Sequence, residues 1–277
     1  MAYMNGHNCS VLCLTHHKNN LYSGGTDGII RIWNTDTCEK LATLRGRTIG
    51  VICLTIHNNK LYSVDGDNTI RVWNTDTNEQ IGTLRGHIGG VRCLALHENK
   101  LYSGSVDKTI RVWNTDTNEQ IASFMGHTYS VRCITLHRNK LYSVDGDITI
   151  RIWNTDTYEF IATLEGHTHC VFCLTVHENK LVSGSWDNTI RVWNTDTHET
   201  IATLEGHTGS VNCFAILKNK LYSGSTDNTI RVWNIETYEE IDTLRGHTCW
   251  VQCLTIHDNK LYSGGEYPDD TIRVWNI

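Results

Sequence analysis

The sequence predicts an all-β fold made of seven copies of one small antiparallel sheet, and two observations carry this prediction. Trp-Asn dipeptides begin at seven positions, separated by 40 residues in five intervals and by 42 in the last. Between them lie short runs rich in Val, Ile, Thr, Tyr and Trp, punctuated by Asn, Asp and Gly, with no sustained helical period. The repeat covers residues 1–277, so we expect a single domain.

One unit, residues 127–166, illustrates the expected strands. Alternation predicts a first strand over 130–137, and turn residues then separate a second over 141–144 from a third over 150–153. A fourth strand over 160–164 ends at Glu-Gly-His. One such sheet cannot bury both of its faces, whereas seven packed radially can, so the predicted architecture is a seven-bladed β-propeller.

Composition excludes several other classes of protein and partner. The chain has 24 Lys and Arg against 30 Asp and Glu, a net charge of −6, which disfavours nucleic acid as a partner. No run of 18 apolar residues occurs, and the N-terminus lacks the pattern of a signal peptide, so no membrane partner is expected. Eleven cysteines, an odd number without an export signal, indicate free thiols in a reducing, cytoplasmic compartment. We expect a monomer.

The repeated pattern resembles a known family. Gly-His followed by Ser-Gly-Ser-x-Asp-x-Thr-Ile-Arg-Val-Trp-Asn is similar to the WD40 repeat, with Trp-Asn in place of Trp-Asp in all seven units. Asn makes the same side-chain-to-backbone turn bond as Asp. The resemblance implies four strands per blade, and residues 1–6, which match the fourth strand at 41–46, then complete the blade formed by 247–277. The turn Thr-Asp-Thr-x-Glu is what that last unit lacks.

The resemblance also implies a buried His-Ser-Asp-Trp hydrogen-bond chain in each blade. Seven copies of a Ser-His-Asp set indicate a structural role, so we predict no catalytic residue and no enzyme. Arg47 replaces the histidine in the second blade, where pairing with Asp67 is expected. The predicted sets are His7, Ser23, Asp27 and Trp33; Ser63, Asp67 and Trp73; His87, Ser103, Asp107 and Trp113; His127, Ser143, Asp147 and Trp153; His167, Ser183, Asp187 and Trp193; His207, Ser223, Asp227 and Trp233; and His247, Ser263, Asp269 and Trp275.

Metal and cofactor sites are not predicted. Cys170 and Cys173 have a metal-like spacing, but residues three apart on a strand point to opposite faces, and no second pair supplies ligands. Histidines end the first strand of six units, with Leu217 in the sixth, and we interpret them as hairpin residues on the face opposite the Gly-His loops.

Positions that vary between the repeats indicate the functional surface. Partners of WD40 propellers commonly dock on the Gly-His face, and the resemblance places there two tryptophans outside the repeated frame and two neighbouring arginines. Exposed aromatics and arginines are typical of binding hot spots, and an arginine pair suits a phosphate or carboxylate. The predicted peptide-binding or partner-binding residues are Arg92, Arg132, Phe172, Trp186, Trp250, Gln252 and Asn212.

The predicted function is a non-catalytic interaction scaffold that binds peptides or proteins on this face, with acidic or phosphorylated motifs as one subtype. In the opposing interpretation, Asp65 and Asp145 neutralise the arginines. The near-identity of the units leaves a further alternative, a self-association module or an engineered repeat protein with no dedicated ligand.

Overall fold

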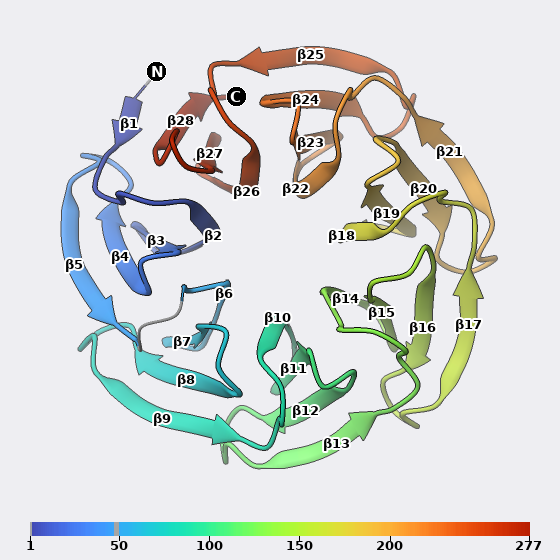
Figure 1. Cartoon of the computed structure of the whole chain (residues 1–277), viewed down its shortest axis with the longest axis horizontal. Coiled ribbons are helices and arrows are strands. Elements are labelled where there is room, and N and C mark those ends of the chain that lie inside the picture. The colour runs from blue at the N-terminus through green and yellow to red at the C-terminus, as the bar shows by residue number, and fades with distance from the viewer. Residues whose placement is uncertain (1, 47–49) are drawn as a thin grey trace.

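The computed structural model describes residues 2–46 and 50–277, and these residues form 28 strands in seven antiparallel sheets. The sheets stand like blades around a central opening, with the first strand of each blade innermost (Figure 1). This arrangement confirms the predicted seven-bladed propeller with four strands per blade.

The strand bounds repeat from blade to blade. Blade 1 contains β2 (Val11–His17), β3 (Asn20–Gly25), β4 (Ile29–Asn34) and β5 (Lys40–Arg45); blade 2 contains β6 (Cys53–His57), β7 (Lys60–Val64), β8 (Thr69–Asn74) and β9 (Gln80–Arg85). Blade 3 contains β10 (Val91–His97), β11 (Lys100–Ser105), β12 (Ile110–Asn114) and β13 (Gln120–Phe124); blade 4 contains β14 (Cys133–His137), β15 (Lys140–Val144), β16 (Ile150–Asn154) and β17 (Phe160–Leu164). Blade 5 contains β18 (Val171–His177), β19 (Lys180–Ser185), β20 (Ile190–Asn194) and β21 (Thr200–Leu204); blade 6 contains β22 (Val211–Leu217), β23 (Lys220–Ser225), β24 (Thr229–Asn234) and β25 (Glu240–Arg245). Blade 7 contains β26 (Val251–His257), β27 (Lys260–Gly265), β28 (Ile272–Asn276) and β1 (Ala2–Met4).

The N-terminal strand closes the ring, as predicted. β1 pairs with β28 in antiparallel register, with Tyr3 opposite Arg273 and Met4 opposite Ile272. Met4 is buried in a cluster with Val11 and Trp33 of blade 1. The strand therefore completes the sheet of blade 7 and also supplies apolar surface to the interface with blade 1 (Figure 1).

The hydrophobic core lies between blades rather than within them. In the first interface, Tyr22 and Ile32 of blade 1 pack with Val51, Leu61 and Trp73 of blade 2. The same set of positions recurs at the other interfaces, which explains why the repeated tryptophan is buried in every blade.

Blades 2 and 4 differ from the other five at one backbone position. A Cβ atom on Gly104 would lie 2.5 Å from Val131 Cγ1 and 2.6 Å from Cys93 Sγ, so only glycine fits there. Blades 2 and 4 carry Val64 and Val144 instead, and their first strands begin at the cysteine without the β-bulge that the other first strands contain. The loop that follows is therefore built differently in these two blades.

The uniform Trp-Asn replacement is compatible with the turn that follows it. Asn194 Oδ1 accepts hydrogen bonds from the backbone N–H groups of Asp196 at 2.8 Å and Thr197 at 3.0 Å. The corresponding bonds occur in the other five turns of this type. The amide oxygen thus does what a carboxylate oxygen does at this position.

Candidate interaction surface

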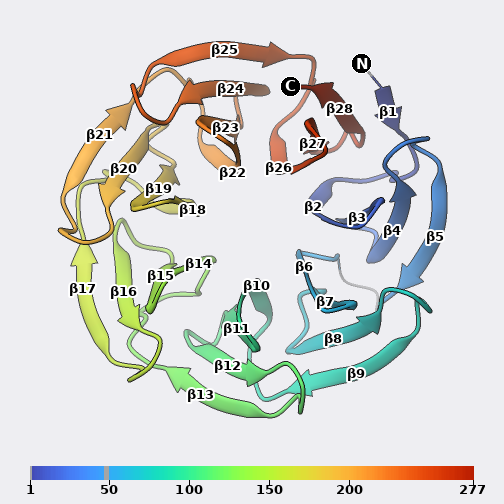
Figure 2. The ribbon, with the colours of Figure 1, turned by 180° about the vertical axis from the view of Figure 1, so that it is seen from behind.

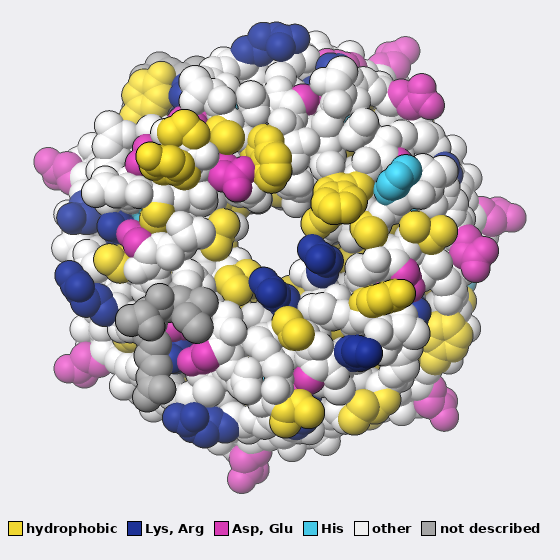
Figure 3. All heavy atoms as spheres, viewed as in Figure 1, with side chains coloured by type: hydrophobic (Ala, Val, Ile, Leu, Met, Phe, Trp, Pro, Cys, Tyr) yellow, Lys and Arg dark blue, Asp and Glu magenta, His cyan; other side chains and the backbone are white. Residues whose placement is uncertain are grey.

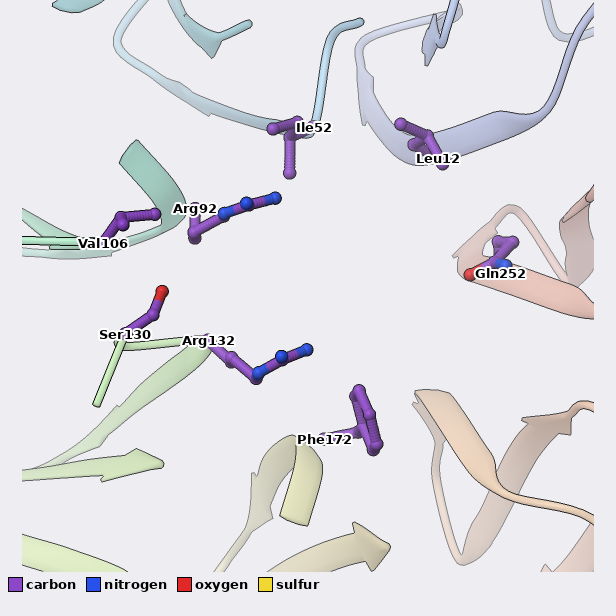
Figure 4. A pocket seen from close by; sticks show the side chains of 8 residues that line it. All are labelled: Leu12, Ile52, Arg92, Val106, Ser130, Arg132, Phe172 and Gln252. Carbon is purple, nitrogen blue, oxygen red and sulfur yellow. The ribbon is translucent and has the colours of Figure 1, made fainter. Parts of the chain in front are cut away.

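The predicted binding residues gather around one mouth of the central opening. Side chains from six blades line a hollow of about 480 Å³ there, with Arg92, Arg132 and Phe172 facing it (Figure 4). A second hollow of about 510 Å³ adjoins the first, because Arg132, Phe172 and Gln252 line both. The space-filling view shows basic and hydrophobic side chains around the opening (Figure 3). We call the two hollows together the upper groove; the lining residues are Leu12, Ile52, Arg92, Val106, Ser130, Arg132, Phe172, Trp186, Ser210, Asn212, Thr226, Trp250 and Gln252.

An arginine and two aromatic rings form a row of contacts within the groove. The guanidinium carbon of Arg132 lies 5.3 Å from the centre of the Phe172 ring. The ring centres of Phe172 and Trp186 lie 5.2 Å apart, with their planes inclined at 47°. Trp186 remains 54% exposed and Trp250 46% exposed. Such large apolar exposure on a rigid frame is characteristic of a binding surface.

The acids that neutralise the arginines in the opposing interpretation are bound elsewhere. Asp65 is buried and forms an ion pair with Arg71, which also pairs with Asp67 at 2.8 Å. The equally buried Asp145 lies 3.2 Å from Arg151 Nη1 and 3.2 Å from His127 Nδ1. Across residues 2–46 and 50–277, no carboxylate forms an ion pair with the arginines at 92 or 132. Both guanidinium groups are exposed.

Asn212 lines the second hollow and also makes a hydrogen bond within the protein. Its side-chain N–H donates to the backbone carbonyl of Val251 at 3.2 Å, so this amide already links blades 6 and 7. Gln252 lines both hollows.

The repeated polar set forms the expected chain beneath the groove in four blades. In blade 5, Trp193 Nε1–H donates to Ser183 Oγ at 2.8 Å, His167 Nε2 lies 2.8 Å from the same oxygen, and His167 Nδ1 lies 2.7 Å from Asp187. Blades 3, 6 and 7 show the same geometry. The serine is fully buried, so its hydroxyl is a structural link that no substrate reaches.

The environment of this chain shifts the pKa values of its members. Burial lowers the pKa of His167, because an imidazolium is poorly solvated there, although the hydrogen bond to Asp187 opposes the effect. Burial alone raises the pKa of Asp187, but hydrogen bonds from Thr189 and His167 outweigh it and lower the value to about 2. A neutral histidine beside an ionised aspartate is therefore the stable arrangement.

Blade 4 does not use the aspartate predicted for it. Asp147 pairs with Arg151 at 3.0 Å, and Asp145, two residues earlier, takes the place beside His127. The reason is that Asp145 occupies the position at which blades 3, 5 and 6 carry a serine such as Ser105, and its longer acidic side chain reaches the imidazole. The pattern Val-Asp-Gly-Asp in place of Gly-Ser-x-Asp was the signal for this difference.

Blades 1 and 2 also depart from the common geometry. In blade 1, Arg31 Nη1 lies 2.6 Å from His7 Nδ1 and 2.6 Å from Asp27 Oδ2. The histidine nitrogen and the aspartate oxygen are therefore 3.5 Å apart. In blade 2, the predicted pairing of Arg47 with Asp67 lies outside the described residues, while Asp67 pairs with Arg71.

Possible metal ligands gather in two places among the described residues. His7, Cys9 and Asp27 form one group, but the Arg31 guanidinium already lies between two of its members. His177, Glu178 and Glu236 form the other, in which Glu236 pairs with Lys180 at 3.0 Å. All eleven cysteines are free thiols, and burial raises the pKa of Cys53 and Cys133 to about 11.

The comparison with family models decides the family. The model described as "WD domain, G-beta repeat" matches residues 1–34, 38–74, 78–114, 118–154, 158–194, 198–234 and 238–276. The chain belongs to the WD40-repeat family. WD40 propellers are typically non-catalytic and serve as scaffolds for protein interactions, and the frame and groove described above agree with that general role.

Comparison with solved structures supports the same fold. A crystal structure of the computationally designed Ika8 protein is similar, with a TM-score of 0.82, 28% identity, and coverage of 99% of this chain and 98% of that one. No curated protein matches the sequence. The described residues include no helix with the length and apolarity needed to span a membrane.

Proposed function

We propose that this WD40 propeller binds a peptide segment of a protein partner in the upper groove, and that the segment carries an acidic or phosphorylated side chain. The observation that carries the proposal is the pair of exposed arginines Arg92 and Arg132, which form no ion pair among the described residues, beside the packed rings of Phe172 and Trp186.

Charge supports an anionic ligand. The chain as a whole carries a charge of −6, yet the upper groove is lined by two cations and by no acidic residue. A guanidinium group donates two parallel hydrogen bonds to a carboxylate or phosphate. A charge-assisted bond contributes about 1.5–3 kcal/mol, so the loss of either arginine is expected to weaken binding by roughly tenfold or more.

The aromatic rings support a peptide rather than a free anion. Phe172, Trp186 and Trp250 line the second hollow together, next to Arg132. A ligand that spans both hollows places its acid on the arginines and an apolar side chain between the rings. We therefore expect an acidic residue followed or preceded by an apolar residue within a few positions.

The proposal is tested with peptide arrays that present acidic, phosphorylated and neutral versions of each sequence. The Arg92→Glu/Arg132→Glu variant should lose binding to the charged versions, and Trp186→Ala should weaken binding to all versions. Arg138→Gln is the matched control, because Arg138 pairs with Asp196 at the far end of its strand. Failure of the folded protein to bind any peptide would favour the alternative of a self-association module or an engineered protein without a ligand.

We also propose a reducing, cytoplasmic location. The support is the set of buried free thiols at one repeated position, including Cys13, Cys93 and Cys173, which pack as small apolar side chains.

A further inference from the structure

A cluster of metal-ligating side chains lies where the closing strand joins blade 1. His7 and Cys9 belong to the segment between β1 and β2, and Asp27 belongs to the turn between β3 and β4. The segment leads from the outer edge of blade 7 to the innermost strand of blade 1 (Figure 2). One ligand atom of each residue, a nitrogen, a sulfur and an oxygen, lies within 4.8 Å of the other two. We call these three residues the blade 1 cluster.

The histidine of the cluster has its lone pair on a different nitrogen from most of its counterparts. Arg31 Nη1 lies 2.6 Å from His7 Nδ1, and because a guanidinium only donates hydrogen bonds, Nδ1 carries the lone pair. In blades 3, 5, 6 and 7 the equivalent Nδ1 lies 2.7 Å from a carboxylate and donates its hydrogen to it. A metal ion binds the lone pair, so His7 can accept an ion at Nδ1 where those four histidines cannot.

The opposite nitrogen of the same ring is held from inside the blade. His7 Nε2 carries the hydrogen and donates to Ser23 Oγ at 2.8 Å. Ser23 is fully buried and also accepts from Trp33 Nε1–H at 2.8 Å. Metal-ligating histidines commonly donate their other N–H in this way, which fixes the orientation of the ring.

The distances suit a tetrahedral ion. His7 Nδ1 and Asp27 Oδ2 are 3.5 Å apart, and two such ligands at about 2.0–2.1 Å from one tetrahedral zinc ion lie about 3.3–3.4 Å apart. A thiolate on the same ion lies about 3.6 Å from them, so binding draws Cys9 inward. Cys9 is half-buried, and its thiol makes only a long contact of 3.8 Å with the carbonyl of Ser10. The side chain is therefore able to turn.

A glycine keeps the space between the histidine and the cysteine open. A Cβ atom on Gly25 would lie 2.7 Å from His7 Nδ1 and 3.1 Å from Cys9 Sγ. Blades 3, 5 and 6 carry a serine at this position, such as Ser105. The smaller residue leaves room for an ion and its water.

Blade 7 serves as an internal comparison, because it has the same three residue types. His247 Nδ1 lies 2.7 Å from Asp269, a separation that leaves no space for an ion between them. Among the described residues, the ligand atoms of His247, Cys249 and Asp269 do not gather within 4.8 Å of one another. The same composition therefore does not make the same site.

Arg31 holds the place of a cation in the blade 1 cluster. Its Nη1 lies 2.6 Å from both the histidine nitrogen and the aspartate oxygen. The equivalent arginine of blade 6, Arg231, turns outward and binds Glu240 on the fourth strand. Blade 1 has Lys40 at the position of Glu240, so Arg31 finds no acid there. An outward orientation of this arginine is thus compatible with the fold, and a divalent ion can displace the guanidinium to it.

We propose that the blade 1 cluster binds a zinc ion through His7 Nδ1, the Cys9 thiolate and Asp27 Oδ2, with water as the fourth ligand. Nitrogen, sulfur and oxygen ligands in a tetrahedral set are typical of zinc. The thiol releases its proton to solvent on binding, and Arg31 turns outward. Because two ligands follow β1 and the third belongs to blade 1, the ion ties the closing strand to the neighbouring blade. The spacing of these residues in the sequence did not predict the site, and the proposal does not depend on the upper groove.

The test titrates the reduced, metal-free protein with Co²⁺, whose absorption reports a bound thiolate and tetrahedral geometry, and then displaces the cobalt with Zn²⁺. We expect one ion per chain, a thiolate-to-cobalt band and a higher melting temperature with Zn²⁺. Cys9→Ser should abolish the band and weaken zinc binding by roughly tenfold or more. Cys249→Ser is the matched control and should preserve both, and circular dichroism verifies that each variant is folded.

A second variant keeps every ligand and changes only the competitor. Lys40→Glu should draw Arg31 outward, as Glu240 draws Arg231, and so tighten zinc binding. Lys108→Glu makes the same charge change at an exposed site on blade 3 and should leave the affinity unchanged. A thiolate band that survives Cys9→Ser, no saturable binding at millimolar metal, or equal zinc affinities of the two lysine variants would each overturn the proposal.

Discussion

Substituting Ser183 by alanine tests the buried polar chain most sharply. The serine oxygen is fully buried, accepts from Trp193 Nε1–H at 2.8 Å and lies 2.8 Å from His167 Nε2. Alanine leaves two buried nitrogen atoms, Trp193 Nε1 and His167 Nε2, without a hydrogen bond, while the bond from His167 Nδ1 to Asp187 remains. Each unsatisfied buried group costs about 1–3 kcal/mol, so the free energy of unfolding should fall by roughly 2–6 kcal/mol.

The assay is equilibrium unfolding in urea, followed by tryptophan fluorescence and circular dichroism, with coincident transitions as the criterion for a two-state analysis. Ser123→Ala on the outer strand β13 is the control and should change stability by less than about 0.5 kcal/mol. Trp193→Phe removes the indole donor. In the double variant, the loss in the free energy of unfolding should be smaller than the sum of the losses in the two single variants. A loss below about 1 kcal/mol for Ser183→Ala, or strict additivity, would refute the reasoning.

Two further predictions concern packing and pH. Gly104→Ala places a Cβ atom 2.5 Å from Val131 Cγ1 and should lower the free energy of unfolding, measured in urea, by about 1–3 kcal/mol. Gly82→Ala is the control and should leave it unchanged, because the nearest atoms to its Cβ lie 3.7 Å away. Equal effects of the two substitutions would contradict the packing argument. Acidification should destabilise the fold: burial, with Arg31 beside it, lowers the pKa of His7 from 6.5 to about 4. As the pH falls from about 6.5 to about 4, His7 is therefore protonated in the unfolded chain before it is protonated in the folded protein. The contribution of His7 to the free energy of unfolding is fully present above about pH 6.5 and should fall by about 2 kcal/mol at pH 5. In the His7→Gln variant, the difference in the free energy of unfolding between pH 7 and pH 5 should be smaller by this amount. An equal pH dependence in the variant would contradict this assignment.

Most of the fold followed from periodicity, because strands, turns and buried tryptophans repeat at a fixed spacing. The closing strand was also predictable, since residues 1–6 match the fourth strand of another unit, and the structure pairs β1 with β28. The pairing of Asp145 rather than Asp147 with His127 was not predicted. Two aspartates two residues apart compete for one histidine and one arginine, and only the backbone path of the loop decides between them.

The residues that line the upper groove were predicted in part for a similar reason. Variable positions identified Arg132, Phe172 and Trp186, but the sequence left open whether Asp65 and Asp145 neutralise the arginines. The local structure of blades 2 and 4 buries both acids against their own arginines, Arg71 and Arg151.

The most direct test of the central claim is the affinity of the upper groove for paired peptides that differ only in one acidic or phosphorylated side chain. The account predicts tighter binding of the charged peptide by the unmodified protein. It also predicts that Arg92→Glu/Arg132→Glu abolishes this preference and that Arg138→Gln preserves it. Equal binding of charged and neutral peptides, or a preference that survives the loss of both arginines, would contradict it.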